Sequence, residues 1–68
     1  MKISFKALRV NSELTQKEAA EMLGITPVTL QNWEAYTTYP SAQQLMQMCE
    51  IYHCELSDIF LPGMQAKS

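Results

Sequence analysis

The chain has 68 residues, of which 47% are hydrophobic, and its formal charge at pH 7 is −2. This length allows one small domain, and the composition is that of a globular rather than a disordered chain. The acidic balance argues against strong nonspecific binding to nucleic acid, because Lys and Arg neutralise the phosphates in such complexes. The charges are unevenly placed: Lys2, Lys6, Arg9 and Lys17 lie in the first quarter of the chain, whereas Glu50, Glu55 and Asp58 lie toward the far end.

The two cysteines, Cys49 and Cys54, could form one disulfide by number alone. However, Met1 and Lys2 lead directly into a polar, amphipathic segment rather than a signal peptide. The sequence therefore predicts reduced cysteines and a cytoplasmic protein. No apolar run approaches the roughly 20 residues needed to cross a bilayer, so we expect no membrane segment.

Apolar residues recur at helical spacing through most of the chain, which predicts an all-α fold. The first helix is expected over roughly residues 3–12. The second begins at Thr15, which forms a possible capping box with Glu18, and runs to about Leu23. Gly24 then supplies the left-handed conformation that ends a helix.

The third helix is expected to begin at Thr26 and Pro27, a capping residue followed by proline at the first helical position, and to end near Glu34. Two short helices joined by about three residues with a glycine are typical of a helix-turn-helix. A loop over residues 35–40 precedes a fourth helix, which begins at Ser41 with a second possible capping box to Gln44. A short last helix at 56–61 closes a five-helix domain over residues 1–62, followed by a tail at 63–68.

The third helix is expected to have a buried and an outward face. At 100° per residue, Leu30 and Trp33 share one apolar arc, so Val28, Gln31 and Asn32 face away from the core. Asn and Gln can bond bidentately to adenine, and Val can contact a thymine methyl group. On an arbitrary surface helix such residues are merely solvated, and it is their place after a helix-turn-helix turn that favours base contacts.

The chain resembles the lambda-repressor-like (Cro/Xre) helix-turn-helix family. The resemblance rests on Leu8-Arg9, Leu14-Thr15-Gln16, Glu18-Ala19-Ala20, Leu23-Gly24-Ile25, Leu30, Trp33-Glu34 and Pro40, and extends to Leu56-Ser57-Asp58-Ile59-Phe60. It implies a compact five-helix domain that binds double-stranded operator DNA as a homodimer, with half-sites about one helical turn apart. A bacterial or phage-encoded transcriptional regulator, most simply a repressor that occupies its operator, is the expected function.

The resemblance also implies roles for individual residues. The base-reading positions are Pro27, Val28, Thr29 and Asn32, with Gln31 on the flank. Gln16 matches the family's Gln that opens the second helix and contacts a backbone phosphate. Independently of the resemblance, further phosphate contacts are expected from Lys17, Thr26, Tyr36, Thr37 and Lys6. Arg9 and Glu34 match a partly buried salt bridge of the family, so Arg9 is interpreted as a scaffold residue rather than a phosphate ligand.

Three positions depart from the family pattern. Glu13 and Tyr36 stand where glycine is common, and either would be strained at positive φ by roughly 1–2 kcal/mol. The loop after the third helix is therefore expected to take another path, in which Tyr36 and Tyr39 either bond phosphates or pack on the domain. Pro27 offers no hydrogen bond to a base, so apolar contact gains weight.

The sequence contains few residues suited to a metal site or to catalysis. Cys49, His53 and Cys54 supply three possible metal ligands where structural zinc takes four, and a Cys-His pair without a pocket is no enzyme, so no metal, cofactor, small-molecule ligand or catalysis is expected. The rival function is a protein-interaction module on the same fold, such as an antirepressor, antitoxin or adaptor. The expected dimer contacts are Ile59, Phe60, Leu61 and Met64, although Ile59 and Phe60 fit a monomer core equally well.

Overall fold

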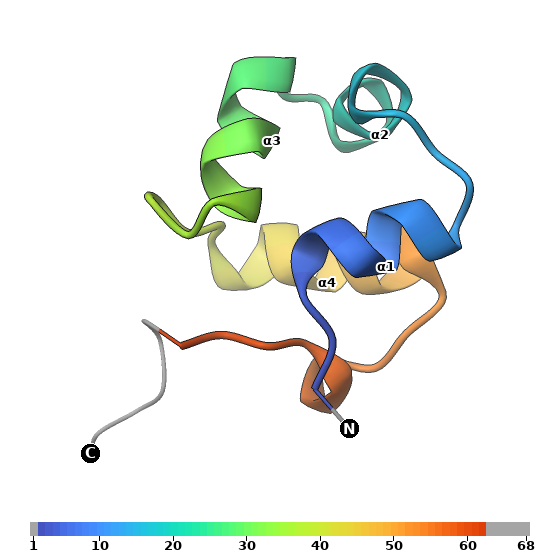
Figure 1. Ribbon diagram of the computed structural model, residues 1–68, viewed down its shortest axis with the longest axis vertical. Helices are drawn as coiled ribbons and strands as arrows, with labels where there is room; N and C mark the ends of the chain where they lie inside the picture. The colour runs from blue at the N-terminus through green and yellow to red at the C-terminus, as the bar shows by residue number, and fades with distance from the viewer. Residues whose placement is uncertain (1, 63–68) are drawn as a thin grey trace.

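The computed structural model describes residues 2–62, which form four α-helices and one 3-10 turn (Figure 1). The elements are α1 (Phe5–Asn11), α2 (Gln16–Leu23), α3 (Pro27–Glu34), α4 (Ala42–Tyr52) and η1 (Leu56–Asp58). The all-α prediction is confirmed for this part of the chain. None of the helices in it is long and apolar enough to span a bilayer.

The prediction of a fifth helix over 56–61 is wrong, because that segment is only a single 3-10 turn. The chain becomes extended at Ile59, with φ −88° and ψ 131°, and forms a parallel bridge with Ile3. The Ile3 amide donates to the Asp58 carbonyl at 2.7 Å, and the Phe60 amide donates to the Ile3 carbonyl at 2.9 Å. The same bridge explains why α1 begins at Phe5 rather than at residue 3.

Each α-helix begins at a hydroxyl side chain, as the capping residues of the sequence predict. The side chains of Thr15 and Ser41 each accept a hydrogen bond from the third amide of their helix. The side chains of Glu18 and Gln44 in turn accept from the backbone amides of Thr15 and Ser41, which confirms both capping boxes. Gly24 ends α2 in the left-handed conformation, with φ 73°. The boundaries of α2 and α3 therefore follow from local sequence alone.

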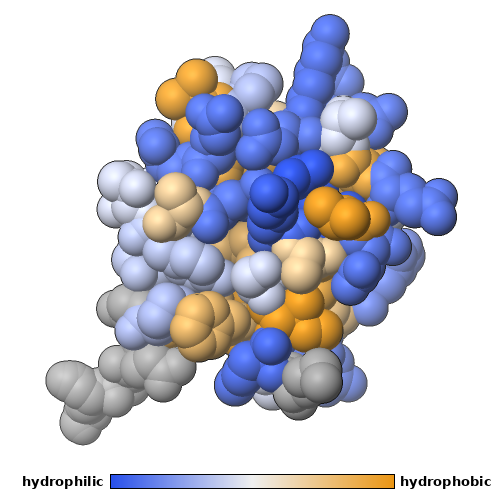
Figure 2. All heavy atoms as spheres, viewed as in Figure 1, coloured by the Kyte–Doolittle hydropathy of each residue, from blue (hydrophilic) through white to orange (hydrophobic). Residues whose placement is uncertain are grey.

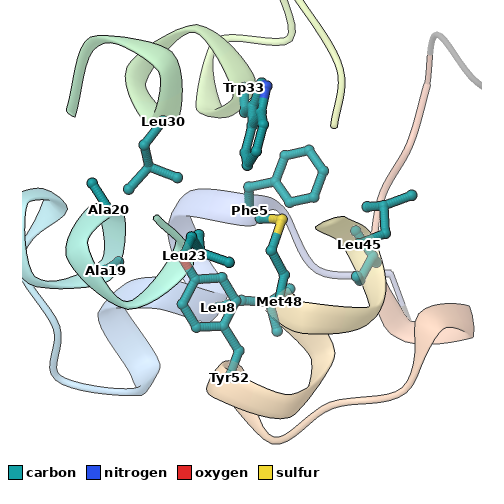
Figure 3. Close-up of a cluster of buried hydrophobic side chains, with 11 residues drawn as sticks. Phe5, Leu8, Ala19, Ala20, Leu23, Leu30, Trp33, Leu45, Met48 and Tyr52 are labelled. Carbon is teal, nitrogen blue, oxygen red and sulfur yellow. The ribbon is translucent and has the colours of Figure 1, made fainter. Parts of the chain in front are cut away.

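One hydrophobic core joins all four helices and the segment after η1 (Figure 3). Its buried residues are Phe5, Leu8, Ala19, Ala20, Leu23, Leu30, Trp33, Leu45, Met48, Tyr52 and Ile59. The side chains at Ala19 and Ala20 are small, so α2 can pack closely against both α3 and α4. Leu30 and Trp33 anchor α3, and burying each large side chain contributes about 1.5–3 kcal/mol.

The two non-glycine residues that were expected to divert the chain adopt the left-handed conformation instead. Glu13 has φ 61° and Tyr36 has φ 60°, so the prediction of another path after the third helix is wrong. At Tyr36 the strain is offset by packing, because its ring stacks on Phe5 with centroids 5.2 Å apart. Its hydroxyl also accepts from the Phe5 amide at 3.3 Å and donates to the Phe60 carbonyl at 2.8 Å.

Candidate nucleic-acid interface

The α2 and α3 helices are joined by a tight turn at residues 24–26 (Figure 1). Gly24 reverses the chain at positive φ, and the amide of Ile25 donates to the carbonyl of Ala20 at 3.0 Å. Thr26 then caps α3 by accepting from the amide of Thr29 at 3.2 Å. This arrangement of two packed helices and a glycine turn is a helix-turn-helix.

The outward face of α3 is uncharged. Val28 is 64% exposed and Gln31 is exposed, whereas Leu30 on the opposite face is fully buried. Asn32 is half-buried and follows Gln31 on the same side of the helix. In Figure 2 the surface over α2 and α3 is mostly hydrophilic and carries isolated hydrophobic residues. A face of amide groups and one branched apolar side chain can form hydrogen bonds and methyl contacts with base edges.

The two threonines at the start of α3 bond to each other. The hydroxyls of Thr26 and Thr29 lie 3.0 Å apart, so one of them donates to the other. Because each hydroxyl has a single hydrogen, one hydrogen of the pair stays free for a ligand. Pro27, which follows the cap, is exposed and offers only its ring.

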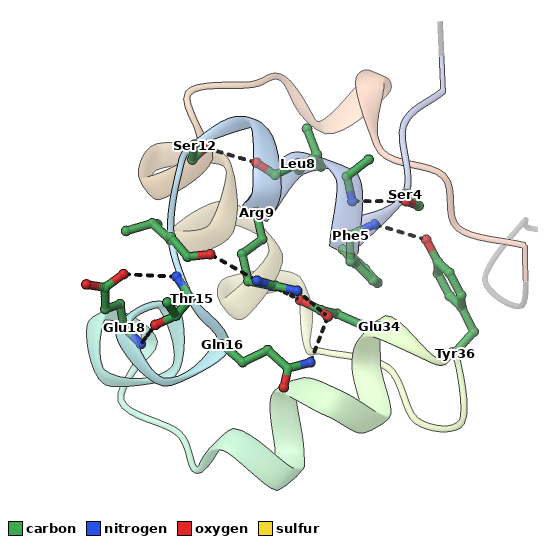
Figure 4. Close-up of polar contacts among 12 residues, drawn as sticks. Ser4, Phe5, Leu8, Arg9, Ser12, Thr15, Gln16, Glu18, Glu34 and Tyr36 are labelled. Carbon is green, nitrogen blue, oxygen red and sulfur yellow. Dashed lines mark hydrogen bonds and ion pairs between the residues drawn. The ribbon is translucent and has the colours of Figure 1, made fainter.

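A buried polar network ties α3 to α1 and to the start of α2 (Figure 4). The Arg9 Nε donates to the Glu34 Oε2 at 2.6 Å, and these side chains are only 10% and 6% exposed. Arg9 also donates to the carbonyl of Leu14 at 2.9 Å. The structure thus contains the ion pair that the family resemblance implied.

The network includes one contact that no pattern in the sequence predicts. The side-chain amide nitrogen of Gln16 donates to the Glu34 Oε1 at 3.0 Å (Figure 4). A primary amide has two hydrogens, so the second hydrogen of Gln16 remains available to an acceptor such as a phosphate oxygen. Glu34 therefore holds the Gln16 amide in a fixed orientation at the N-terminus of α2.

Free cations near the helix-turn-helix are few. Lys17 is exposed in the first turn of α2, and Lys6 is exposed in the first turn of α1. Lys2 is engaged, because its Nζ donates to the Ser57 carbonyl at 2.8 Å. No Lys or Arg occurs anywhere from residue 18 to residue 62. Within residues 2–62, electrostatic attraction to phosphates would therefore depend mainly on Lys6 and Lys17, and nonspecific affinity should be low.

The residues after α3 differ in how far they are buried. The Tyr36 hydroxyl is engaged with Phe5 and Phe60, and desolvation by burial raises its pKa. Thr37 is exposed, and its amide donates to the Asn32 carbonyl at 2.9 Å. Tyr39 is half-buried beside Tyr36. Of the expected phosphate ligands in this loop, Thr37 remains accessible, whereas Tyr36 serves the scaffold.

The remaining candidate residues lie elsewhere in the fold. Cys49 and Cys54 are unpaired thiols, and burial, followed by the neighbouring Cys49, raises the pKa of Cys54 to about 11. Among residues 2–62 there is no group of three or more His, Cys, Asp or Glu side chains placed to hold a metal ion. Ile59 is 1% exposed and belongs to the core, so it is not free to form a dimer contact; Met64 and the tail at 63–68 lie outside the described residues.

The sequence matches a family model described as Helix-turn-helix over residues 5–59. The chain therefore belongs to the helix-turn-helix family of the Cro/Xre type, as the resemblance indicated. Membership implies DNA binding, and the family is typically not enzymatic. A comparison with curated proteins found no match.

Proposed function

We propose that the protein is a sequence-specific transcriptional regulator that places α3 in the major groove of an operator and represses by occupying it. The observation that carries the proposal is the uncharged outward face of α3, held by the buried Leu30 and Trp33 on its other side. A rigid backing of this kind fixes the depth and tilt at which side chains meet base edges. A bacterial or phage-encoded regulator of this kind would act in the cytoplasm, where its operator DNA would lie.

Base recognition would fall to the outward-facing side chains of α3, of which Pro27, Val28 and Gln31 are exposed and Thr29 and Asn32 are half-buried. Asn32 and Gln31 would hydrogen-bond to base edges, and Val28 would contact thymine methyl groups. Pro27 adds apolar contact, and Thr29 adds one hydroxyl if Thr26 supplies the shared hydrogen. Specificity would thus rest on few hydrogen bonds and a large share of shape and methyl recognition.

Phosphate contacts would orient α3 without reading the sequence. Gln16 is the strongest candidate, since Glu34 already fixes its amide. Thr26 lies at the positively polarised start of α3, and Lys6, Lys17 and Thr37 are exposed. With so few contacts, two protomers on adjacent half-sites would be needed for useful affinity, so we propose a homodimer on DNA.

The test is selection of bound duplexes from a random pool at two salt concentrations, followed by titration of the selected site. Asn32→Ala should cost about 1–3 kcal/mol on that site and relax one base position. Lys17→Ala should weaken binding to all sequences alike and lower the salt slope by about one. Gln47→Ala, on the exposed side of α4, is the matched control and should change neither quantity. Selection that enriches no sequence would refute the proposal.

One observation favours the rival function, a protein-interaction module on the same fold. The chain from residue 18 to residue 62 contains six carboxylates and no Lys or Arg, which disfavours approach to a polyanion. If this rival is correct, duplexes leave the amide signals of Val28, Gln31 and Asn32 unchanged and a polypeptide ligand shifts them. The duplex titration above therefore separates the two functions.

A further inference from the structure

A shallow groove runs between the C-terminal half of α4 and η1. Its volume is about 420 Å³, and it is lined by Met46, Cys49, Glu50, Cys54, Glu55 and Leu56. A second hollow of about 680 Å³ shares four of these residues and adds His53 and Asp58. We call the two together the α4–η1 groove. None of its lining residues is among the expected DNA contacts.

The groove follows from the way α4 ends. His53 caps the helix in the left-handed conformation, with φ 56°, and the amide of Cys54 donates to the carbonyl of Cys49 at 3.0 Å. This bond closes a turn that brings the residue after the cap against the last turn of the helix. Cys54 and Cys49 therefore lie side by side, and Leu56 follows next to α4. The shape of the groove thus follows from the backbone turn at His53.

Large apolar side chains stand exposed at this groove. Met46 is 64% exposed and Leu56 is 50% exposed, and both line the same hollow. Single exposed apolar residues are ordinary, but two that border one groove with thiol groups between them form a contiguous apolar surface. Such a surface gains free energy when a partner covers it.

The rim of the groove is acidic. Glu50, Glu55 and Asp58 surround it, and from residue 18 to residue 62 no Lys or Arg is present to neutralise them. Lys2 lies beside η1, where its Nζ donates to the Ser57 carbonyl and keeps its positive charge. The surface therefore combines an apolar floor with an edge that carries three carboxylates, Glu50, Glu55 and Asp58.

We propose that the α4–η1 groove binds a Lys- or Arg-rich segment of another protein that presents an apolar face. The apolar side chains of such a segment would cover Met46 and Leu56, and its cations would meet Glu50, Glu55 and Asp58. A nucleic acid does not fit, because its phosphates would face these carboxylates. A second copy docked by two-fold symmetry would place carboxylates opposite carboxylates, so it is a poorer occupant.

The groove and the α3 face can be occupied at the same time. In Figure 1, α3 and η1 lie at opposite ends of the long axis of the molecule. A partner at the groove would therefore remain clear of a duplex at α3. The docking site would let another protein be recruited to, or carried by, the DNA-bound domain. Peptide binding can be measured without DNA, so this inference stands or falls separately from the proposed function.

The experiment titrates the whole chain with synthetic helical peptides of about 14 residues and follows amide signals by NMR. The first peptide has a Leu stripe flanked by Lys, the second has the same stripe flanked by Glu, and the third keeps Lys but replaces Leu with Ser. The Lys–Leu peptide should shift the signals of Cys54 and Leu56, and the other two should bind at least about tenfold more weakly.

Variants then locate the site. Glu50→Lys should weaken binding of the Lys–Leu peptide about two- to fivefold, the range expected for one exposed ion pair. Met46→Ser should weaken it about tenfold, and circular dichroism should confirm that this exposed position does not alter folding. Glu21→Lys makes the same change of charge on the exposed side of α2 and should change affinity less than twofold.

Three outcomes would overturn the inference. The first is an equal effect of Glu50→Lys and Glu21→Lys, because net charge alone would then explain binding. The second is a set of shifted signals outside the groove. The third is self-association in sedimentation that Met46→Ser abolishes, which would assign the groove to a second copy of the chain.

Discussion

Replacing Arg9 by Met should nearly unfold the domain. The guanidinium is the charged partner of Glu34, whose side chain is 6% exposed and would keep only the amide of Gln16. Leaving a buried charge without its partner costs about 3–5 kcal/mol. The bond from Arg9 to the Leu14 carbonyl is also lost, which adds about 1 kcal/mol. A domain of this size has a total stability of only about 3–10 kcal/mol.

The measurement is urea unfolding at 25 °C followed by circular dichroism. The double variant Arg9→Met/Glu34→Leu removes both charges, so it should recover most of the stability lost in the single variant. Lys6→Met, an exposed change of the same kind on α1, should alter the free energy of unfolding by less than about 0.5 kcal/mol. The reasoning is refuted if Arg9→Met lies within about 1 kcal/mol of the parent, or if the double variant is no more stable than the single one. If Arg9→Met lost DNA binding, the expected cause would be unfolding of the domain rather than loss of a contact between Arg9 and DNA.

Three further outcomes can be measured on the same chain. Glu13→Gly should stabilise the domain by about 1 kcal/mol in urea unfolding, because Glu13 is exposed at φ 61° and glycine is unstrained there; a loss of stability would contradict this. Tyr52→Phe should be neutral or stabilising by up to about 1 kcal/mol, since the buried Tyr52 hydroxyl has no hydrogen-bond partner among residues 2–62 and desolvation raises its pKa to about 12. A clear loss of stability would reveal a partner such as a bound water. At pH 8, iodoacetamide should alkylate Cys54 about tenfold more slowly in the native chain than in urea, because its raised pKa of about 11 lowers the thiolate fraction more than it raises nucleophilicity. Equal alkylation rates in the native chain and in urea would refute the raised pKa. The raised pKa also means that the contribution of Cys54 to stability is present below about pH 9 and is lost as the pH rises toward 11.

Much of the fold could be predicted because its boundaries are encoded locally. Thr15, Gly24 and Ser41 mark helix ends through their own hydrogen bonds or backbone preference, and the structure has each of them in that role. Periodicity correctly separated the buried Leu30 and Trp33 from the exposed Val28 and Gln31. The segment after residue 55 was misassigned because its conformation is set by pairing with Ile3, which no local pattern contains.

The candidate sites show the same division. The Arg9–Glu34 pair followed from the family resemblance, but the bond between Gln16 and Glu34 depends on the meeting of two helix ends. For Tyr36 the sequence left open a phosphate contact or packing on the domain. It could not decide between them, because the contacts of Tyr36 with Phe5 and Phe60 join distant parts of the chain. The α4–η1 groove was missed for the same reason, since it arises only when the chain folds back at His53.

The parallel bridge between Ile3 and Ile59 has a consequence for how the molecule is made. A ribosome synthesises residue 3 more than 50 positions before residue 59, so the N-terminal segment must wait for its pairing partner. Until then Ile3 and the core around Phe5 lack their cover. A nascent chain truncated before residue 59 should therefore remain a target for chaperones and proteases. Native structure should be acquired only after residue 59 has been synthesised.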